Sequence, residues 1–241
     1  MPPTPDPIAG SVWLRPARPR RGRPQLSREE IVGAAIEILD ADGLDGLSMR
    51  RLAAHLSAGA TSAYFYVATK DELLELAVDE IMGEIDIPDP AGVGWRTAAA
   101  ALAGGLRGVI LRHTWLTGLL GVHPAIGPNA LRIGERSAAV LTAAGFAGRE
   151  LAWASSLLTA HAVGAATAEA ALQSAMAQAG KNAADLLGQL HPYIESVAGE
   201  YPMLAAWFGQ NESLDVAAHQ DAAFAFGLER VLDGLESWLK K

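Results

Sequence analysis

The sequence predicts an all-α protein, on the basis of its composition and the spacing of its apolar residues. Half of the 241 residues are hydrophobic, but only 6% are aromatic, and alanine and leucine dominate. Strand-forming residues are too sparse, and alternate too rarely, to build a sheet. The length allows one large domain or two small ones with an ample core. We therefore expect a chain made almost entirely of helices.

Residues 1–26 predict a disordered basic arm. This segment is rich in proline and arginine and shows no apolar periodicity. It also lacks the basic start and apolar run of a secretory signal. The net charge of the whole chain is −8, but the charges are unevenly distributed, because the arm is basic and much of the acid lies at 71–86 and in the C-terminal two-thirds.

The next segment, residues 27–87, opens with a predicted helix whose start and end are both marked by capping residues. Ser27 is followed three residues later by Glu30, a capping box that satisfies exposed backbone donors at a helix start. Apolar residues then recur at the three-to-four spacing of one helix face, and Gly43 supplies a left-handed stop.

Two further short helices and the start of a fourth follow in this segment. Ser48 caps the second helix, and small residues at 57–60 separate it from a third helix at about 60–67. Two short helices joined by such a turn are typical of a helix-turn-helix, whose second helix can lie in the major groove of DNA. A capping box at Thr69 opens a fourth helix that reaches about Ile85.

Prolines and glycines between positions 88 and 94 predict a domain boundary, and residues 88–241 predict a larger helical domain. We expect its helices at about 95–113, 114–122, 128–144, 148–179, 182–198 and 214–239. The uncharged run 151–168 is long enough for a membrane span. Its hydroxyl groups, its histidine and its many alanines favour a buried helix instead, so we expect no membrane partner.

The composition excludes several classes of function. The chain has no cysteine, which excludes disulfides, cysteine nucleophiles and thiolate metal sites and agrees with a reducing cytoplasm. It contains no glycine-rich phosphate loop and no HExxH or GxSxG motif, and its six histidines are scattered singly. We therefore expect a cytoplasmic protein with no catalytic residues, no metal, no cofactor and no enzymatic activity.

Residues 26–85 resemble the DNA-binding region of the TetR family, the tetracycline-repressor-like transcriptional regulators. The residues that carry this resemblance follow the small-residue turn at fixed spacing: Thr61, Ser62, Tyr64, Phe65, Tyr66, Val67, Thr69, Lys70, Asp71, Glu72, Leu73 and Leu74. Ser57 stands where glycine is usual, and Tyr66 where histidine is common. The stretches 127–146 and 226–238 resemble the C-terminal domain of the branch closest to the tetracycline repressor.

The resemblance implies a double-stranded DNA operator as partner. It assigns DNA contacts to Ser48, Arg50, Arg51, Thr61, Ser62, Tyr64, Tyr66 and Lys70. Hydroxyls on the third helix can donate to phosphates or base edges, and Arg50 is the candidate for bidentate reading of guanine. Arg51 contacts phosphate or pairs with an acid, and Lys70 lies in a first helical turn that favours phosphate. The plainer alternatives are a solvated arginine pair and an aromatic triplet packed in the core.

Two interpretations stay open for the arm. Its arginines at positions 20, 21 and 23 (Arg20, Arg21 and Arg23) resemble a short basic hook that enters the narrow minor groove of A·T-rich DNA. Alternatively, the arm is a generally basic tail that adds only electrostatic attraction.

For the larger domain, the resemblance implies a homodimer and an effector pocket. Two copies reading two half-sites would recognise a palindromic operator, and the dimer contact would lie on helices 148–179 and 214–239. The apolar stripes of these helices serve equally well as intramolecular core. The candidates for effector binding are His113, Trp115, Ser137, Trp153 and His161, with Trp207 and Phe208 as lids. For each of them, ordinary core packing is the alternative.

These expectations combine into one functional hypothesis. The chain is a DNA-binding repressor that a small lipophilic or polycyclic molecule releases from its operator. The alternatives are an activator of the same fold and a helical interaction module that does not bind DNA, which the acidic net charge favours.

Overall fold

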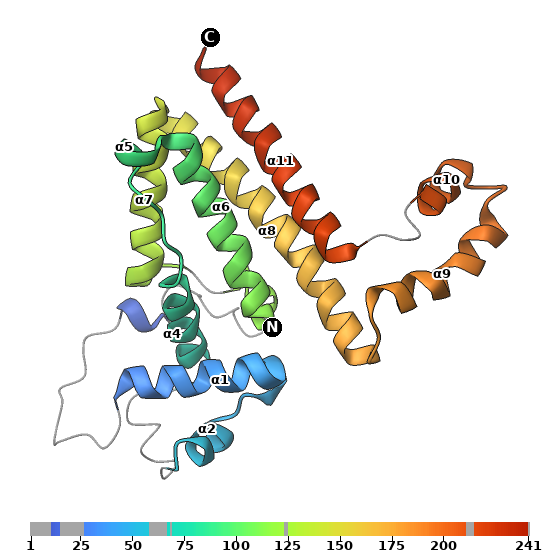
Figure 1. The fold of residues 1–241 in the computed structure, drawn as a ribbon. Helices are drawn as coiled ribbons and strands as arrows, with labels where there is room; N and C mark the ends of the chain where they lie inside the picture. Colours follow the sequence, from blue (N-terminus) through green and yellow to red (C-terminus); the bar gives the residue numbers. More distant parts are fainter. Residues whose placement is uncertain are drawn as a thin grey trace, which may run out of the picture.

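The computed structural model describes residues 11–14, 27–57, 67, 69–122, 125–210 and 215–240. The described chain consists of helices joined by turns and contains no strand, which confirms the all-α prediction (Figure 1). In this part of the chain, no helix combines the length and the apolar character needed to cross a bilayer.

The N-terminal region is built from three described helices: α1 (Arg28–Gly46), α2 (Met49–His55) and α4 (Lys70–Met82). The predicted capping box starts α1, because Ser27 Oγ accepts from Glu30 N at 3.0 Å and Glu30 Oε2 accepts from Ser27 N at 2.6 Å. Gly43 takes the expected left-handed conformation, with φ of 68°, and kinks the helix. The helical run nevertheless continues to Gly46, three residues beyond the predicted stop.

The larger region places α6 among the other long helices, beside both α7 and α8, and α11 lies along α8 (Figure 1). The pair α9 and α10 extends away from this body (Figure 1). The elements of the region are α5 (Pro90–Val93), α6 (Trp95–Arg112), η2 (Thr114–Gly118), α7 (Pro128–Ala144), α8 (Gly148–Ala179), α9 (Ala183–Val197), α10 (Pro202–Gln210) and α11 (Val216–Leu239).

The structure corrects three expectations about these elements. The helix expected at 114–122 is only the short 3-10 helix η2 followed by a turn, in which Gly121 has φ of 76°. The structure adds the helix α10 at a position where none was expected, and Pro202 starts it, in keeping with the preference of proline for the first turn of a helix. Finally, residues 11–14 lie in the arm expected to be disordered, but Val12–Leu14 form the 3-10 helix η1, which docks on α4.

One continuous apolar core runs from α1 to α11. Ile85 and Ile87 lie beside the boundary expected between the two regions, and both are buried in this core. Three leucines of the apolar stripe of α11 are also buried within the chain: Leu228, Leu232 and Leu235. Movements of α4 are therefore mechanically linked to the C-terminal helices, because densely packed interiors transmit displacement.

Candidate DNA interface and the joint between the two regions

The described parts of the expected DNA interface are the start of α2 and the start of α4. Ser48 Oγ accepts from Arg51 N at 3.2 Å, so Ser48 is engaged as the helix cap. Arg50 and Arg51 are exposed, whereas Leu52 and Ala53, which follow them, are buried. The helix therefore presents both arginines to solvent.

The two arginines have different surroundings. Arg51 forms an ion pair with Asp42, and its Nη1 lies 3.4 Å from the carbonyl oxygen of Gly46. These contacts tie α2 to the end of α1, which is the acid-pairing alternative considered for Arg51. Arg50 lies outside this pair and remains the candidate for reading a base.

Lys70 begins α4, where a phosphate contact was expected. Its Nζ donates to the carbonyl oxygen of Leu44 at 2.8 Å, and Thr69 Oγ1 caps the same helix by accepting from Glu72 N at 3.1 Å. The ammonium group therefore holds the start of α4 against the end of α1. A phosphate would have to share or displace this hydrogen bond.

Two sets of expected DNA contacts lie outside the described residues. The first comprises Thr61, Ser62, Tyr64 and Tyr66 of the expected third helix, and the second comprises Arg20, Arg21 and Arg23 of the arm. Val67, at the end of the expected third helix, is fully buried in the core. The assignments of both sets remain predictions.

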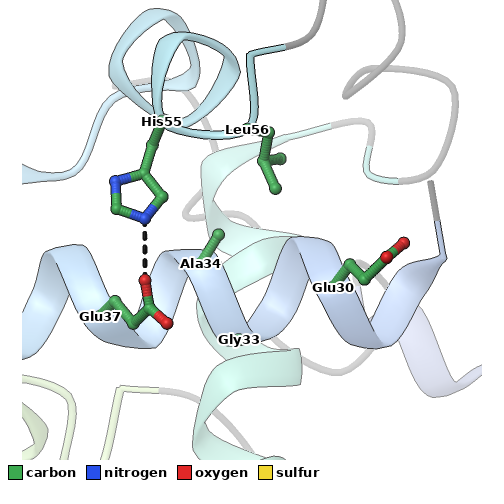
Figure 2. Close-up of a pocket in the computed structure, with 6 residues that line it drawn as sticks. All are labelled: Glu30, Gly33, Ala34, Glu37, His55 and Leu56. Carbon is green, nitrogen blue, oxygen red and sulfur yellow. Dashed lines mark hydrogen bonds and ion pairs between the residues drawn. The ribbon is translucent and has the colours of Figure 1, made fainter. Parts of the chain in front are cut away.

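A hollow of about 450 Å³ opens between α1 and α2 (Figure 2). His55 Nε2 lies 2.8 Å from Glu37 Oε2 at one side of it, and Glu30 lies at the other side (Figure 2). Two carboxylates repel phosphate, so this hollow does not suit a DNA backbone. Its lining residues are Glu30, Gly33, Ala34, Glu37, His55 and Leu56.

A polar cluster joins α1 to the C-terminal helices. His113 follows the end of α6 and is 6% exposed. Its Nδ1 lies 2.7 Å from Asp40 Oδ1 on α1, and its Nε2 lies 3.0 Å from Glu84 Oε1, just after α4. Trp115 Nε1 donates to the same Asp40 oxygen at 2.7 Å. We call Asp40, Glu84, Arg112, His113 and Trp115 the polar joint.

Both ring nitrogens of His113 face carboxylate oxygens, Nδ1 that of Asp40 and Nε2 that of Glu84. Burial acts to raise the pKa of Glu84, but hydrogen bonds from Arg112 and His113 outweigh it and hold this pKa below its ordinary value of 4.5. The joint is therefore a charged contact between the two regions.

The structure does not bring the five effector candidates together. His113 and Trp115 belong to the polar joint. Ser137 on α7 is buried and lies 3.4 Å from Ser155 on α8, oxygen to oxygen. Trp153 is 60% exposed on α8. His161 stacks on Phe224 of α11, with ring centroids 5.2 Å apart. The suggested lids Trp207 and Phe208 lie on α10 and contact each other edge to face.

Sequence reasoning missed two arginines that hold α11 in place. Arg107 on α6 donates to Glu169 on α8 at 2.8 Å and to Asp221 on α11 at 2.6 Å, and its guanidinium lies over the ring of Phe224. Arg96 donates to three acids of α11: Glu229, Asp233 and Glu236. In the sequence, only the recurrence of acidic residues every three or four positions on α11, at Glu229, Asp233 and Glu236, indicates such contacts. In the described residues, no group of three His, Asp or Glu side chains is placed to hold a metal ion.

Comparison with known proteins decides the family. Residues 87–239 match the family described as the tetracyclin repressor-like C-terminal domain. An HTH-type transcriptional regulator of Saccharopolyspora erythraea is 38% identical over 212 residues, which cover 88% of this chain and 87% of that protein. The chain belongs to the TetR family. It is therefore a DNA-binding transcriptional regulator of the TetR type.

Other TetR-family proteins extend the comparison. The HTH-type transcriptional repressor DrrR1 of Streptomyces coeruleorubidus is 36% identical over 93% of this chain and 83% of its own. ActR of Streptomyces coelicolor, solved in complex with actinorhodin, is 34% identical with a TM-score of 0.73, over 88% of this chain and 95% of that chain. ActR has also been solved with (S)-DNPA.

The polar joint predicts an acid-sensitive contact. The pKa of Glu84 is lower in the folded than in the unfolded chain, so its carboxylate stabilises the fold above about pH 4.5 and loses this effect as the pH falls through the folded pKa. We expect Glu84→Gln to flatten the decline of Tm below about pH 5. Thermal unfolding across pH measures this, with the exposed Glu80→Gln as control. Equal slopes for Glu84→Gln and the wild type would contradict it.

Proposed function

We propose that this TetR-family regulator is a repressor that binds a palindromic operator as a homodimer and leaves it when a small molecule binds the C-terminal helices. The main support is the match along nearly the whole chain to regulators that include a named repressor, DrrR1. The described capping, turn and exposed arginines of α2 agree with a helix-turn-helix that can dock on DNA.

The proposed DNA face combines α2 with the third-helix segment. Arg50 is exposed at the start of α2, where it can reach a base edge or a phosphate, while Arg51 supports the helix through Asp42. Thr61, Ser62, Tyr64 and Tyr66 supply hydroxyls for the groove, as the family pattern implies. The hollow between α1 and α2 is not part of this proposed face, because the carboxylates of Glu30 and Glu37 in its lining repel the phosphates of the duplex.

The proposed dimer face follows one exposed stripe of α8. Trp153 and Leu157 are exposed on this stripe, and Gly164 and Ala168 continue it at helical spacing. Large apolar side chains supply area to bury, and the small residues allow a second helix to approach closely. Phe226 on α11 is also exposed, at 66%. A second copy of this chain would cover side chains that are otherwise left to solvent.

The proposed effector site lies among α6, α7 and α8, and the polar joint lies at the end of α6. ActR, which shares this fold, has been solved with two different small molecules. We propose a lipophilic or polycyclic effector. The joint then carries the response, because any displacement of the end of α6 moves His113 against Asp40 of α1 and Glu84 after α4.

The coupling follows from linkage. An effector that binds better to a conformer with mis-spaced DNA-reading helices lowers DNA affinity by its differential affinity for the two conformers, and DNA weakens the effector reciprocally. Couplings of about 1–3 kcal/mol change affinity roughly 5- to 150-fold.

Selection of bound fragments from random DNA by the full chain tests this function. We expect one enriched palindromic sequence, because two symmetric copies read two half-sites. Screening aromatic and lipophilic compounds for loss of the bound fragment then tests the release. A protein that enriches no DNA sequence would contradict the proposal, and an enriched site bound more tightly with every active compound would contradict release.

The adjacent arginines of α2 provide a matched pair of variants. On the selected DNA, we expect Arg50→Ala to weaken binding by about 1–3 kcal/mol and to relax preference at one base pair. Arg51→Ala removes the same charge, but its main effect is to break the ion pair with Asp42, so base preference should stay unchanged. Electrophoretic mobility shifts on a set of single-base variants measure both. Equal preference in the wild type and Arg50→Ala would remove Arg50 from base reading.

A charged residue introduced on the exposed stripe of α8 tests the dimer face. We expect Trp153→Asp to lower the dimer fraction, because a carboxylate in the interface has no described partner and must lose its hydration. Leu131→Asp is the control, since Leu131 is 61% exposed on α7, outside the proposed face. Sedimentation velocity measures the mass of each variant. A dimer fraction that Trp153→Asp leaves unchanged would place the interface elsewhere.

A further inference from the structure

The segment at 11–14 is anchored by a buried carboxylate of α4. Ser11 is fully buried, and its Oγ donates to Glu75 Oε2 at 2.8 Å. The backbone N–H of Val12 donates to the same oxygen at 3.0 Å. Glu75 itself is 7% exposed, so these donors help to offset the cost of removing its charge from water. The segment therefore supplies hydrogen bonds to a buried carboxylate of α4.

Trp13 links this anchor to two further elements. A Cβ atom added to Gly127, at the start of α7, would lie 2.7 Å from Trp13 Cζ2, so the ring packs against a position that only glycine leaves open. On another side, the guanidinium carbon of Arg28, the first residue of α1, lies 5.2 Å from the ring centroid. Trp13 thus contacts both the start of α7 and the start of α1.

The same face of α4 also holds the start of α7 directly. Asp79 lies one turn beyond Glu75, is 5% exposed, and accepts from the backbone N–H groups of Asn129 at 3.2 Å and Ala130 at 3.0 Å. An added Cβ at Gly127 would also collide with the Asp79 carboxylate. The short blue segment beside α4 and below α7 in Figure 1 is η1, which lies at this meeting point.

We propose that Ser11, Val12, Trp13 and Leu14 form a clasp that fixes this part of the basic arm to the junction of α4 and α7. A change of position between α4 and α7 would separate Glu75 from Gly127 and open the clasp. The clasp thereby connects the position of the arm to the relative position of α4 and α7. Its functional consequence rests on the proposed function, because the arm contributes to DNA affinity only in a DNA-bound protein.

The clasp can affect DNA binding because of the residues that flank the arginine-rich segment. The arginine-rich segment 15–26 begins at the clasp and ends at Ser27, next to Arg28, which itself contacts Trp13. Holding the two residues that flank a segment reduces the number of positions its charges can take before binding, which lowers the entropic cost of placing those charges on DNA. With the clasp open, the same arginines would remain but would lose this advantage.

Glycine-to-alanine variants of α7 test the clasp in the full chain. Gly127→Ala places a methyl group where Trp13 and Asp79 lie, whereas Gly134→Ala, on the same helix, meets nothing within 4 Å. We expect hydrogen exchange of the peptide containing 11–14 to quicken in Gly127→Ala and to stay unchanged in Gly134→Ala. Trp13→Ala serves as the second variant, because it removes the ring without altering α7. Unprotected exchange at 11–14 in the wild type, or protection unchanged in both disruptive variants, would overturn the clasp.

DNA binding tests the consequence. Trp13→Ala retains every arginine, so on the selected DNA we expect affinity to fall roughly three- to tenfold and the salt slope to decrease by about one for each phosphate that the arm no longer neutralises. Equal affinity and slope in Trp13→Ala and the wild type would overturn the role of the clasp in DNA binding. A wild-type chain that selects no DNA would instead refute the proposed function, and hydrogen exchange at 11–14 would still decide the clasp.

Discussion

Carboxylates on and just after α4 have to be matched by donors, and this requirement organises the contacts between the two halves of the chain. Glu75 takes its donors from the N-terminal segment, Asp79 from the start of α7, and Glu84 from the end of α6. Glu75 and Asp79 are buried, and a buried carboxylate without partners is strongly unfavourable, so their contacts constrain where α4 lies. Glu84 is exposed, and its contacts with Arg112 and His113 add a surface connection just after α4. Displacement of any one of the recruited elements therefore acts on α4.

This arrangement gives the C-terminal helices a short polar route to the DNA-binding region. His113 lies between Asp40 of α1 and Glu84, and Trp115 adds a second donor to Asp40. Arg112 and His113, at the end of α6, both contact the Glu84 carboxylate, at distances of 2.7 to 3.0 Å. A regulator needs such a contact, since a ligand can shift the DNA-bound conformer only through differences that reach the reading helices.

The acidic net charge is compatible with DNA binding once the charges are located in the fold. Many carboxylates neutralise arginines inside the C-terminal region, as in the contacts of Arg96 and Arg107 with α8 and α11. These pairs hold helices together and leave the arginines of α2 on the opposite part of the molecule. Net charge describes the sum, whereas DNA responds to the charges on the surface that faces it.

Sequence alone determined the all-α class, the family and the capped starts of α1, α2 and α4, because apolar spacing and capping depend on residues a few positions apart. Only the tertiary structure decided that His113 and Trp115 belong to the polar joint and that Ser11–Leu14 dock on α4. Asp40 and His113 are 73 positions apart, and Ser11 and Glu75 are 64 apart. Contacts over such separations leave no periodic pattern in a single chain, since they arise when packing brings distant helices together.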